Sequence, residues 1–315
     1  MQQLPLGRTG LKIAPLVFGG NVFGWTANES TSFELLDAFI AAGFNCIDTA
    51  DMYSRWAPGN KGGESETIIG KWLRSRDMRA RVVVATKVGG DLGDGRKGLA
   101  KKHILEGVEG SLRRLQTDYI DLYQAHFDDE SVPMEETLEA FVRLLEQGKV
   151  RAIGASNYKG SRLRAALRVS EQHHWPRYET LQPHYNLYDR SDFETNLEPV
   201  CREQHIGVIP YYSLASGFLT GKYRSANDSG KSPRGAGMKR FLTERGQRIL
   251  AALDEVAAAL QARPAQVALG WLLSRPTVVA PIASATNREQ LSDLVKGVQL
   301  QLDASTLARL DAASD

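Results

Sequence analysis

The chain has 315 residues, 42% of them hydrophobic and 24% charged, a composition typical of an ordinary globular protein. Its 39 basic and 37 acidic residues leave a formal net charge of +2, which gives no reason to expect binding to nucleic acid or to a membrane surface. Because it has no long apolar run, no signal-peptide core at its start and only Cys46 and Cys201, we expect a cytoplasmic protein without a disulfide framework.

Segments that predict strands alternate along the chain with segments that predict helices. A hairpin is expected at 4–15, around a GRTG turn. Apolar segments then predict eight strands, at 16–20, 44–48, 81–87, 119–126, 150–156, 178–182, 206–211 and 277–284. Most of them are continuous apolar runs, which are typical of strands covered on both faces.

Amphipathic segments between these strands predict helices. They lie at 32–43, 64–76, 102–115, 133–149, 161–172, 192–204, 243–262 and 264–274. Pro264 opens the last of them at a first-turn position, which is a helix-start signal. The alternation favours an α/β fold that closes as a (β/α)8 TIM barrel over an open sheet. We expect residues 1–315 to form a single domain, with the hairpin at the bottom of the barrel and an extra C-terminal helix at 302–314.

One long irregular segment, at 222–240, carries six basic residues and one acidic residue. Loops of this length are either mobile surface loops or lids over a binding site, and the sequence leaves both interpretations open.

Polar groups stand where the predicted strands end, and in a parallel barrel all of these ends meet on one rim. In chain order they are Gly20, Asn21, Asp48, Lys87, His126, Ser156, Asn157, Gln182, Tyr211 and Ser284, and Tyr53 follows shortly after Asp48. Taken singly, Lys87 could be a surface lysine, Asp48 a turn cap and His126 a packed buried histidine. Their position on successive strands favours a catalytic group.

The residue types fit proton transfer to a carbonyl oxygen. A free phenol, with a pKa of about 10, is a weak acid near neutrality, and we expect the neighbouring ammonium of Lys87 to lower the pKa of Tyr53. Asp48 would hold Lys87 in place and keep it charged, and His126 would orient the carbonyl by a hydrogen bond.

No side chain supplies a hydride, so the reaction needs a cofactor. The chain has no GxGxxG motif, because Asn21 replaces the second glycine in the segment 19–24. The segment 217–223 lacks the Ser or Thr of a P-loop after Lys222. A cofactor would therefore lie across the mouth of the barrel. His173 and His174 have no partner motif, so we expect no metal site.

With these residues in view, the chain resembles the aldo-keto reductase superfamily, most closely its bacterial members. The resemblance covers essentially the whole chain. Asp48, Tyr53, Lys87 and His126 match the catalytic tetrad of the family, and FNCIDTADMYS matches the signature around its tyrosine. The blocks GKVRAIGASNY, LQPHYNLYDR and PYYSLASGFLTGKY match three further family motifs.

The resemblance implies an NADPH-dependent reduction of aldehydes or ketones in which Tyr53 donates the proton. It implies that Ser156, Asn157 and Gln182 bind the carboxamide of the nicotinamide and that Tyr211 stacks on its ring. The further expected cofactor residues are Gly20, Asn21, Asp48, Leu214, Ser216, Gly217, Leu219, Lys222, Ser284, Thr286, Arg288 and Gln290. The segment 222–240 resembles the part of the family that covers the cofactor.

The chain departs from the family pattern near the adenosine end of the cofactor. Ser284 and Thr286 stand where many members have an Arg or Lys for the 2′-phosphate, and Leu294 stands where an Asn is common. Arg288 remains as a cation, so NADP(H) is the expected cofactor and NAD(H) stays open. In the Tyr211 block, Tyr212 and Ser213 replace the more common Ser-Pro, which changes the stiffness of that loop.

Three functional hypotheses remain open at this stage. The first is a carbonyl reductase for a small-molecule substrate, with Tyr53, His126 and the loop residues Phe23, Trp25, Arg55 and Trp56 around the substrate. The second is a cofactor-binding regulatory module, because potassium-channel β-subunits resemble the same family. The third is a Schiff-base enzyme with Lys87 as nucleophile, although Asp48 would keep that lysine charged. The substrate and the oligomeric state stay open.

Overall fold

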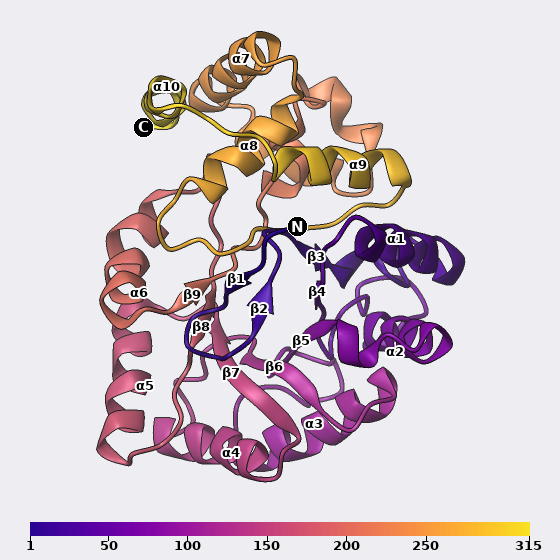
Figure 1. Ribbon diagram of the computed structural model, residues 1–315, viewed down its shortest axis with the longest axis vertical. Helices are drawn as coiled ribbons and strands as arrows, with labels where there is room; N and C mark the ends of the chain where they lie inside the picture. Colours follow the sequence, from indigo (N-terminus) through magenta and orange to yellow (C-terminus); the bar gives the residue numbers. More distant parts are fainter.

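The computed structural model describes residues 1–315, and eight parallel strands form its centre (Figure 1). From the first strand to the seventh, each pairs with the next along the chain, and the eighth pairs with the first. The strands are β3 (Val17–Gly19), β4 (Cys46–Asp48), β5 (Val83–Val88), β6 (Ile120–Ala125), β7 (Val150–Ser156), β8 (Thr180–Gln182), β9 (Gly207–Val208) and β10 (Ile282–Ala283). The fold is the expected α/β barrel.

Hydrogen bonds between β9 and the segment just before β10 close the barrel. The backbone N–H of Val279 donates to the carbonyl of Val208 at 2.8 Å, and that of Ile282 donates to Pro210 at 2.9 Å. Both of these strands are shorter than the sequence indicates. The reason is that Pro210 and Pro281 have no N–H to donate, so a regular ladder cannot continue through them.

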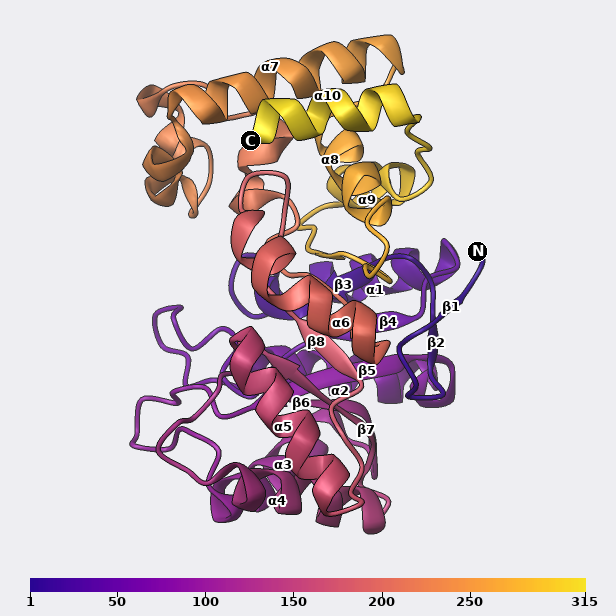
Figure 2. The ribbon, with the colours of Figure 1, turned by 90° about the vertical axis from the view of Figure 1, so that its left-hand side faces the viewer.

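The hairpin formed by β1 (Leu4–Pro5) and β2 (Lys12–Ile13) covers one end of the barrel, as expected. Leu6 and Ile13 are fully buried and belong to the cluster of 11 residues that fills the barrel interior. In Figure 2 the hairpin lies on the right, whereas the long loops that follow β4 to β6 lie on the left, at the opposite end of the strands.

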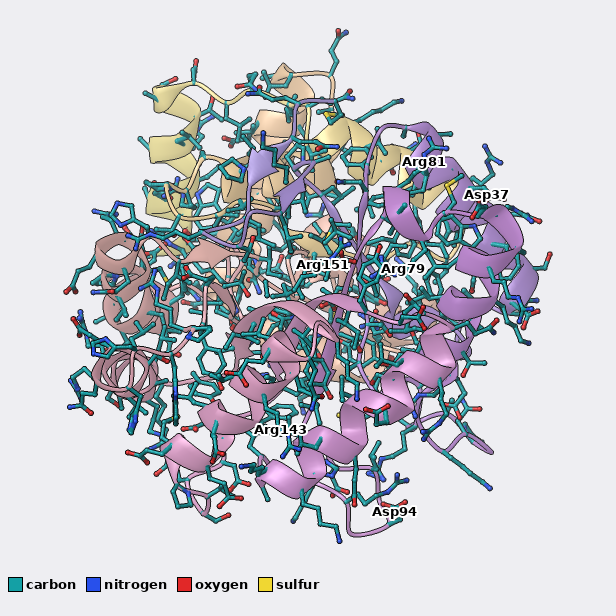
Figure 3. All side chains as sticks on the ribbon, turned by 60° about the horizontal axis from the view of Figure 1, so that its bottom comes forward. Asp37, Arg79, Arg81, Asp94, Arg143 and Arg151 are labelled. Atoms are coloured by element: carbon teal, nitrogen blue, oxygen red, sulfur yellow. The ribbon has the colours of Figure 1, made fainter.

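A buried ion cluster lies toward the hairpin end of the strands. Asp121, the second residue of β6, is 2% exposed and accepts hydrogen bonds from Arg79 at 2.7 Å and Arg151 at 3.0 Å. Both guanidinium groups also lie 3.8 Å from the centroid of the Tyr119 ring. Figure 3, seen from below, shows the two arginines close together near the centre. This end is therefore tied together by structural contacts.

Helices surround the strands and bury a second, larger cluster of 72 residues between the two layers. They are α1 (Glu29–Ala41), α2 (Glu64–Arg76), α3 (Lys101–Leu115), α4 (Met134–Glu146), α5 (Gly160–Gln172), α6 (Glu198–Gln204), α7 (Glu244–Ala259), α8 (Pro264–Leu273), α9 (Arg288–Gly297) and α10 (Ala304–Ser314). The extra C-terminal helix α10 packs on α7, outside the ring of barrel helices (Figure 1).

The structure corrects four sequence expectations on the helices. The helix α9, which packs between α8 and α1, was not predicted, and α7 lies outside the ring. The helix α1 begins three residues earlier than expected because the side chain of Asn28 caps the N–H of Thr31. The segment predicted as one helix at 192–204 is a π-helical turn followed by α6, with Pro199 in the first turn of α6.

None of the helices combines the length and the apolar character that crossing a bilayer requires.

Candidate active site

The four residues of the predicted catalytic group come together at one end of the barrel. Asp48 is the last residue of β4, Lys87 lies near the end of β5, and His126 directly follows β6. Tyr53 lies in the loop between β4 and α2, which folds back over the strand ends. Asp48 and Lys87 are buried, and Tyr53 is half-buried beside them.

Lys87 is the centre of this group. Its Nζ donates to Asp48 Oδ2 at 2.8 Å, to the carbonyl of Thr49 at 2.8 Å and to the hydroxyl oxygen of Tyr53 at 2.9 Å. All three protons of the ammonium are thus used, and one carboxylate compensates its charge. The hydroxyl of Tyr53 donates to Asp48 Oδ2 over a long distance of 3.3 Å, and so weak a bond leaves the phenol proton free to transfer.

The expected lowering of the Tyr53 pKa is wrong for this pocket. Burial and then the charge of Asp48 raise the pKa of Tyr53 well above its ordinary value. Burial also lowers the pKa of Lys87, while Asp48 acts in the opposite direction. Tyr53 therefore keeps its proton at neutral pH, which is the state that a proton donor needs.

His126 is neutral. Burial, followed by the nearby charge of Lys87, lowers the pKa of its imidazole well below the ordinary value. Its Nδ1 is buried without a hydrogen-bond partner. Because buried N–H groups without a partner are rarer than buried acceptors without one, we assign the proton to Nε2. The imidazole can then donate a hydrogen bond from Nε2 without carrying a charge.

Amide and hydroxyl groups from β7 and β8 lie beside the catalytic group. Gln182 donates from Nε2 to Asp48 Oδ1 at 2.8 Å, and Ser156 donates to the carbonyl of Gln182 at 3.0 Å. Asn157 adopts a positive φ of 56° and donates to the carbonyl of His126 at 2.9 Å. The hydroxyl of Tyr211 donates to Asn157 Oδ1 at 2.6 Å, which fixes the tyrosine ring over this group.

The segment that follows Tyr211 makes a sharp turn. Ala215, Ser216 and Gly217 all have positive φ, which bends the backbone sharply between Leu214 and Leu219. A Cβ added to Gly217 would lie 3.5 Å from Nζ of Lys222, so the lysine lies directly over the turn. The side chain of Leu219 is fully buried, so only its backbone can face a ligand.

The expected residues for the adenosine end lie on the connection from β10 to α9. Ser284 contacts the carbonyl of Gly19 and Asn21 Oδ1, each at 2.7 Å, and so joins this connection to the end of β3, where Gly20 also lies. Arg288 is the exposed first residue of α9, and no ion pair holds its side chain. Thr286 donates its N–H to Gln290 Oε1 at 2.9 Å.

Aromatic side chains surround the opening above Tyr53. Trp56 is 45% exposed, and its ring lies edge-on to both Tyr53 and Trp25. Arg55 precedes Trp56 in the same loop and is partly exposed, without an ion pair, and its guanidinium lies against Gly93. Phe23, expected in the same wall, is instead buried in the core, where it stacks on Phe18 with the ring centroids 5.2 Å apart.

Three further residues of this opening were missed in the sequence. Phe127 stacks on His126 at 4.6 Å and is 45% exposed, and Tyr212 is 42% exposed beside Tyr211. Each directly follows a residue that the sequence does identify, His126 or Tyr211. That neighbouring position could have indicated that they line the opening. Arg234 lies over Trp25, and nothing in the composition of the segment 222–240 distinguishes it from the other basic residues there.

The described residues contain no group of three or more His, Cys, Asp or Glu side chains arranged to hold a metal ion.

Comparisons with known proteins point to one family. The model of the Aldo/keto reductase family matches residues 15–315. The uncharacterized oxidoreductase YrpG of Bacillus subtilis is 36% identical over 99% of this chain and 95% of its own length. Protein tas of Escherichia coli is 31% identical over 99% of this chain and 97% of its own length. A probable voltage-gated potassium channel subunit beta of Oryza sativa is 32% identical over 95% of this chain and 92% of its own length.

Proposed function

The chain belongs to the aldo/keto reductase family, and from that premise we propose that it reduces aldehydes or ketones to alcohols with NADPH. One observation carries the proposal: the hydroxyl of Tyr53 receives a hydrogen bond from buried Lys87 beside the neutral imidazole of His126. Neither the Lys87 contact nor a neutral histidine is needed for packing alone. Together they provide a proton donor and a hydrogen-bond donor at one carbonyl oxygen.

In the proposed reaction, the substrate carbonyl oxygen lies between the Tyr53 hydroxyl and His126 Nε2. His126 orients the oxygen by donating a hydrogen bond, and Tyr53 transfers its proton as negative charge develops there. Lys87 stabilises the phenolate that remains on Tyr53, because its Nζ lies 2.9 Å from the phenolic oxygen. Asp48 keeps Lys87 in position throughout. Positioned acid catalysis of this kind contributes typically ~10² to 10⁴ in rate.

The residues around the tetrad fit a nicotinamide cofactor. When it is bound, the cofactor supplies the hydride for the carbonyl carbon. The amide and hydroxyl groups of Ser156, Asn157 and Gln182 are the donor and acceptor types that a carboxamide requires, and the ring of Tyr211 offers an aromatic face beside them. The turn at Gly217 lets a ligand approach its backbone beneath Lys222, which suits a pyrophosphate.

NADPH is proposed over NADH because Arg288 is an unpaired cation at the start of α9, where the helix dipole also favours a phosphate.

We further propose that residues 1–315 act as one domain, since a single cluster of 72 buried residues surrounds the barrel.

The test is a panel of aldehydes and ketones in which cofactor oxidation is followed with NADPH and NADH in parallel. Oxidation of NADPH that depends on a carbonyl compound, and faster than with NADH, is the expected result. Cofactor binding without turnover of any carbonyl compound would instead favour a regulatory binding module. That alternative stays in view because the relative from Oryza sativa is described as a channel subunit.

A further inference from the structure

Arg234 brings a positive charge to the opening above Tyr53. It immediately precedes the 3-10 segment Gly235–Phe241, and its guanidinium carbon lies 5.4 Å from the centroid of the Trp25 ring. The side chain is partly buried, yet it forms no ion pair, and no side-chain hydrogen bond holds its guanidinium group. An arginine in this position has lost part of its hydration without gaining an ion-pair or hydrogen-bond partner.

A continuous row of rings joins this guanidinium to the proposed proton donor. The Trp25 ring lies 5.8 Å from the Trp56 ring, which in turn lies 6.0 Å from the Tyr53 ring. Arg234 and the Tyr53 hydroxyl are therefore two polar ends of one aromatic opening. A substrate with its carbonyl at Tyr53 would extend along these rings toward Arg234.

No carboxylate balances the charge of Arg234. Burial lowers the pKa of its guanidinium, and the ionisable groups that act on it are the phenols of Tyr212, Tyr53 and Tyr223. Burial keeps the Tyr53 phenol protonated at neutral pH, so it brings no negative charge beside Arg234. The opening therefore carries an uncompensated positive charge when it is empty.

The other cations of the same segment are placed differently. Arg224 is paired with Asp254 at 2.7 Å, and Lys231 is paired with Asp228 at 2.7 Å. Lys239 and Arg240 are both exposed, and Arg240 lies over Phe241. Lys222 lies over the turn at Gly217, and there it would serve the pyrophosphate of the proposed cofactor. Among these residues, Arg234 is the one that lies over the aromatic rings of the opening.

We propose that Arg234 forms an anion subsite in the substrate pocket, so that the preferred substrates are aldehydes or ketones that carry a carboxylate or another anionic group at the end away from the carbonyl. The inference rests on the proposed reductase function. Trp25, Trp56 and Phe127 would cover the apolar part of such a substrate, and a charge-assisted hydrogen bond to Arg234 would hold its anionic end.

The test compares 4-formylbenzoate with its neutral methyl ester as substrates of the wild-type protein, Arg234→Met and Arg234→Lys. The quantity measured is the ratio of the two kcat/KM values, acid over ester. We expect Arg234→Met to lower this ratio about tenfold to a hundredfold, which corresponds to losing one hydrogen bond to a charged group. Arg234→Lys should restore part of it. Arg240→Met, which removes a cation outside the opening, should leave the ratio at its wild-type value.

Two binding measurements separate the possible causes. The Kd of NADPH is measured for each variant by quenching of tryptophan fluorescence. An unchanged acid-to-ester ratio with weakened NADPH binding would assign Arg234 to the cofactor and overturn the proposal. If the wild type reduces neither of these two aldehydes, the carbonyl panel still decides the proposed function, and the equilibrium binding of 4-formylbenzoate decides the subsite. Equal binding to wild type and Arg234→Met would refute it, and weaker binding to Arg234→Met would support it.

Discussion

Lys87 has no exposed surface, yet its ammonium group is fully hydrogen bonded and paired with Asp48. The meeting of these side chains could be predicted from the sequence, because the ends of parallel strands all lie on one rim of a barrel. The protonation of these groups could not, because it depends on burial. Burial, followed by the charge of Asp48, raises the pKa of Tyr53 instead of lowering it.

Asp51, two residues before Tyr53, is a buried acid that the proposed reaction does not use. It is 3% exposed, and its Oδ1 has no hydrogen-bond partner. Burial, followed by the charge of Glu66, raises the pKa of Asp51 to about 8. The folded protein therefore keeps a proton on Asp51 at neutral pH, whereas the unfolded chain releases it at about pH 4. This group makes the folded state less stable as pH rises between those two values.

Asp51→Asn should remove that pH dependence. We expect the free energy of unfolding of the variant, relative to wild type, to increase from pH 5 to pH 8, by up to about 1.4 kcal/mol per pH unit. Urea denaturation at several pH values measures it, with the exposed Glu34→Gln as the control. A difference between Asp51→Asn and wild type that does not change with pH would contradict the assignment.

At the scale of elements, the alternation of strands and helices predicted most of the barrel. The helix α9 was missed because its segment was interpreted only as a cofactor motif, although Asn287 caps it by accepting the N–H of Gln290. The break before α6 comes from Pro199. The sequence shows this proline inside an otherwise helical pattern, but it does not show how far the helix deforms there. The sequence thus predicted which segments are helical better than it predicted where those helices end or bend.

The start of α9 carries the prediction on cofactor choice. Arg288→Ala should weaken NADPH binding far more than NADH binding, because only NADPH has a 2′-phosphate to form a charge-assisted contact. Fluorescence titration with both cofactors measures the two Kd values. Arg309→Ala, an exposed arginine on α10 that pairs with Glu255, is the control and should affect neither. Equal weakening of both cofactors by Arg288→Ala would mean that Arg288 does not contact the 2′-phosphate.

At the scale of the whole molecule, the two ends of the barrel differ in what their residues do. The hairpin closes one end through Leu6 and Ile13, and the opposite end holds the polar groups around Lys87. Gly7 allows the hairpin to dock, because it has a φ of 57° and a Cβ there would lie 2.2 Å from the carbonyl of Glu179. Stability and chemistry can therefore be changed separately.

Leu6→Ala tests this separation. Removing a fully buried leucine should lower the free energy of unfolding by about 2–5 kcal/mol, because a cavity remains in the barrel interior. The Kd of NADPH should stay within twofold of wild type. Urea denaturation gives the stability, and Leu260→Ala, at a leucine that is 39% exposed, serves as the control. A large change in cofactor affinity would show that the hairpin end and the catalytic end are coupled.

The most direct test of the whole account is turnover by Tyr53→Phe, measured with NADPH and an aldehyde that the wild type reduces. The substitution keeps the ring and removes only the hydroxyl that Lys87 contacts, so the fold and the Kd of NADPH should be preserved. We predict that kcat falls by ~10² or more, the usual scale for losing a positioned general acid. Turnover close to wild type, with NADPH still bound, would contradict the role of Tyr53 as the proton donor.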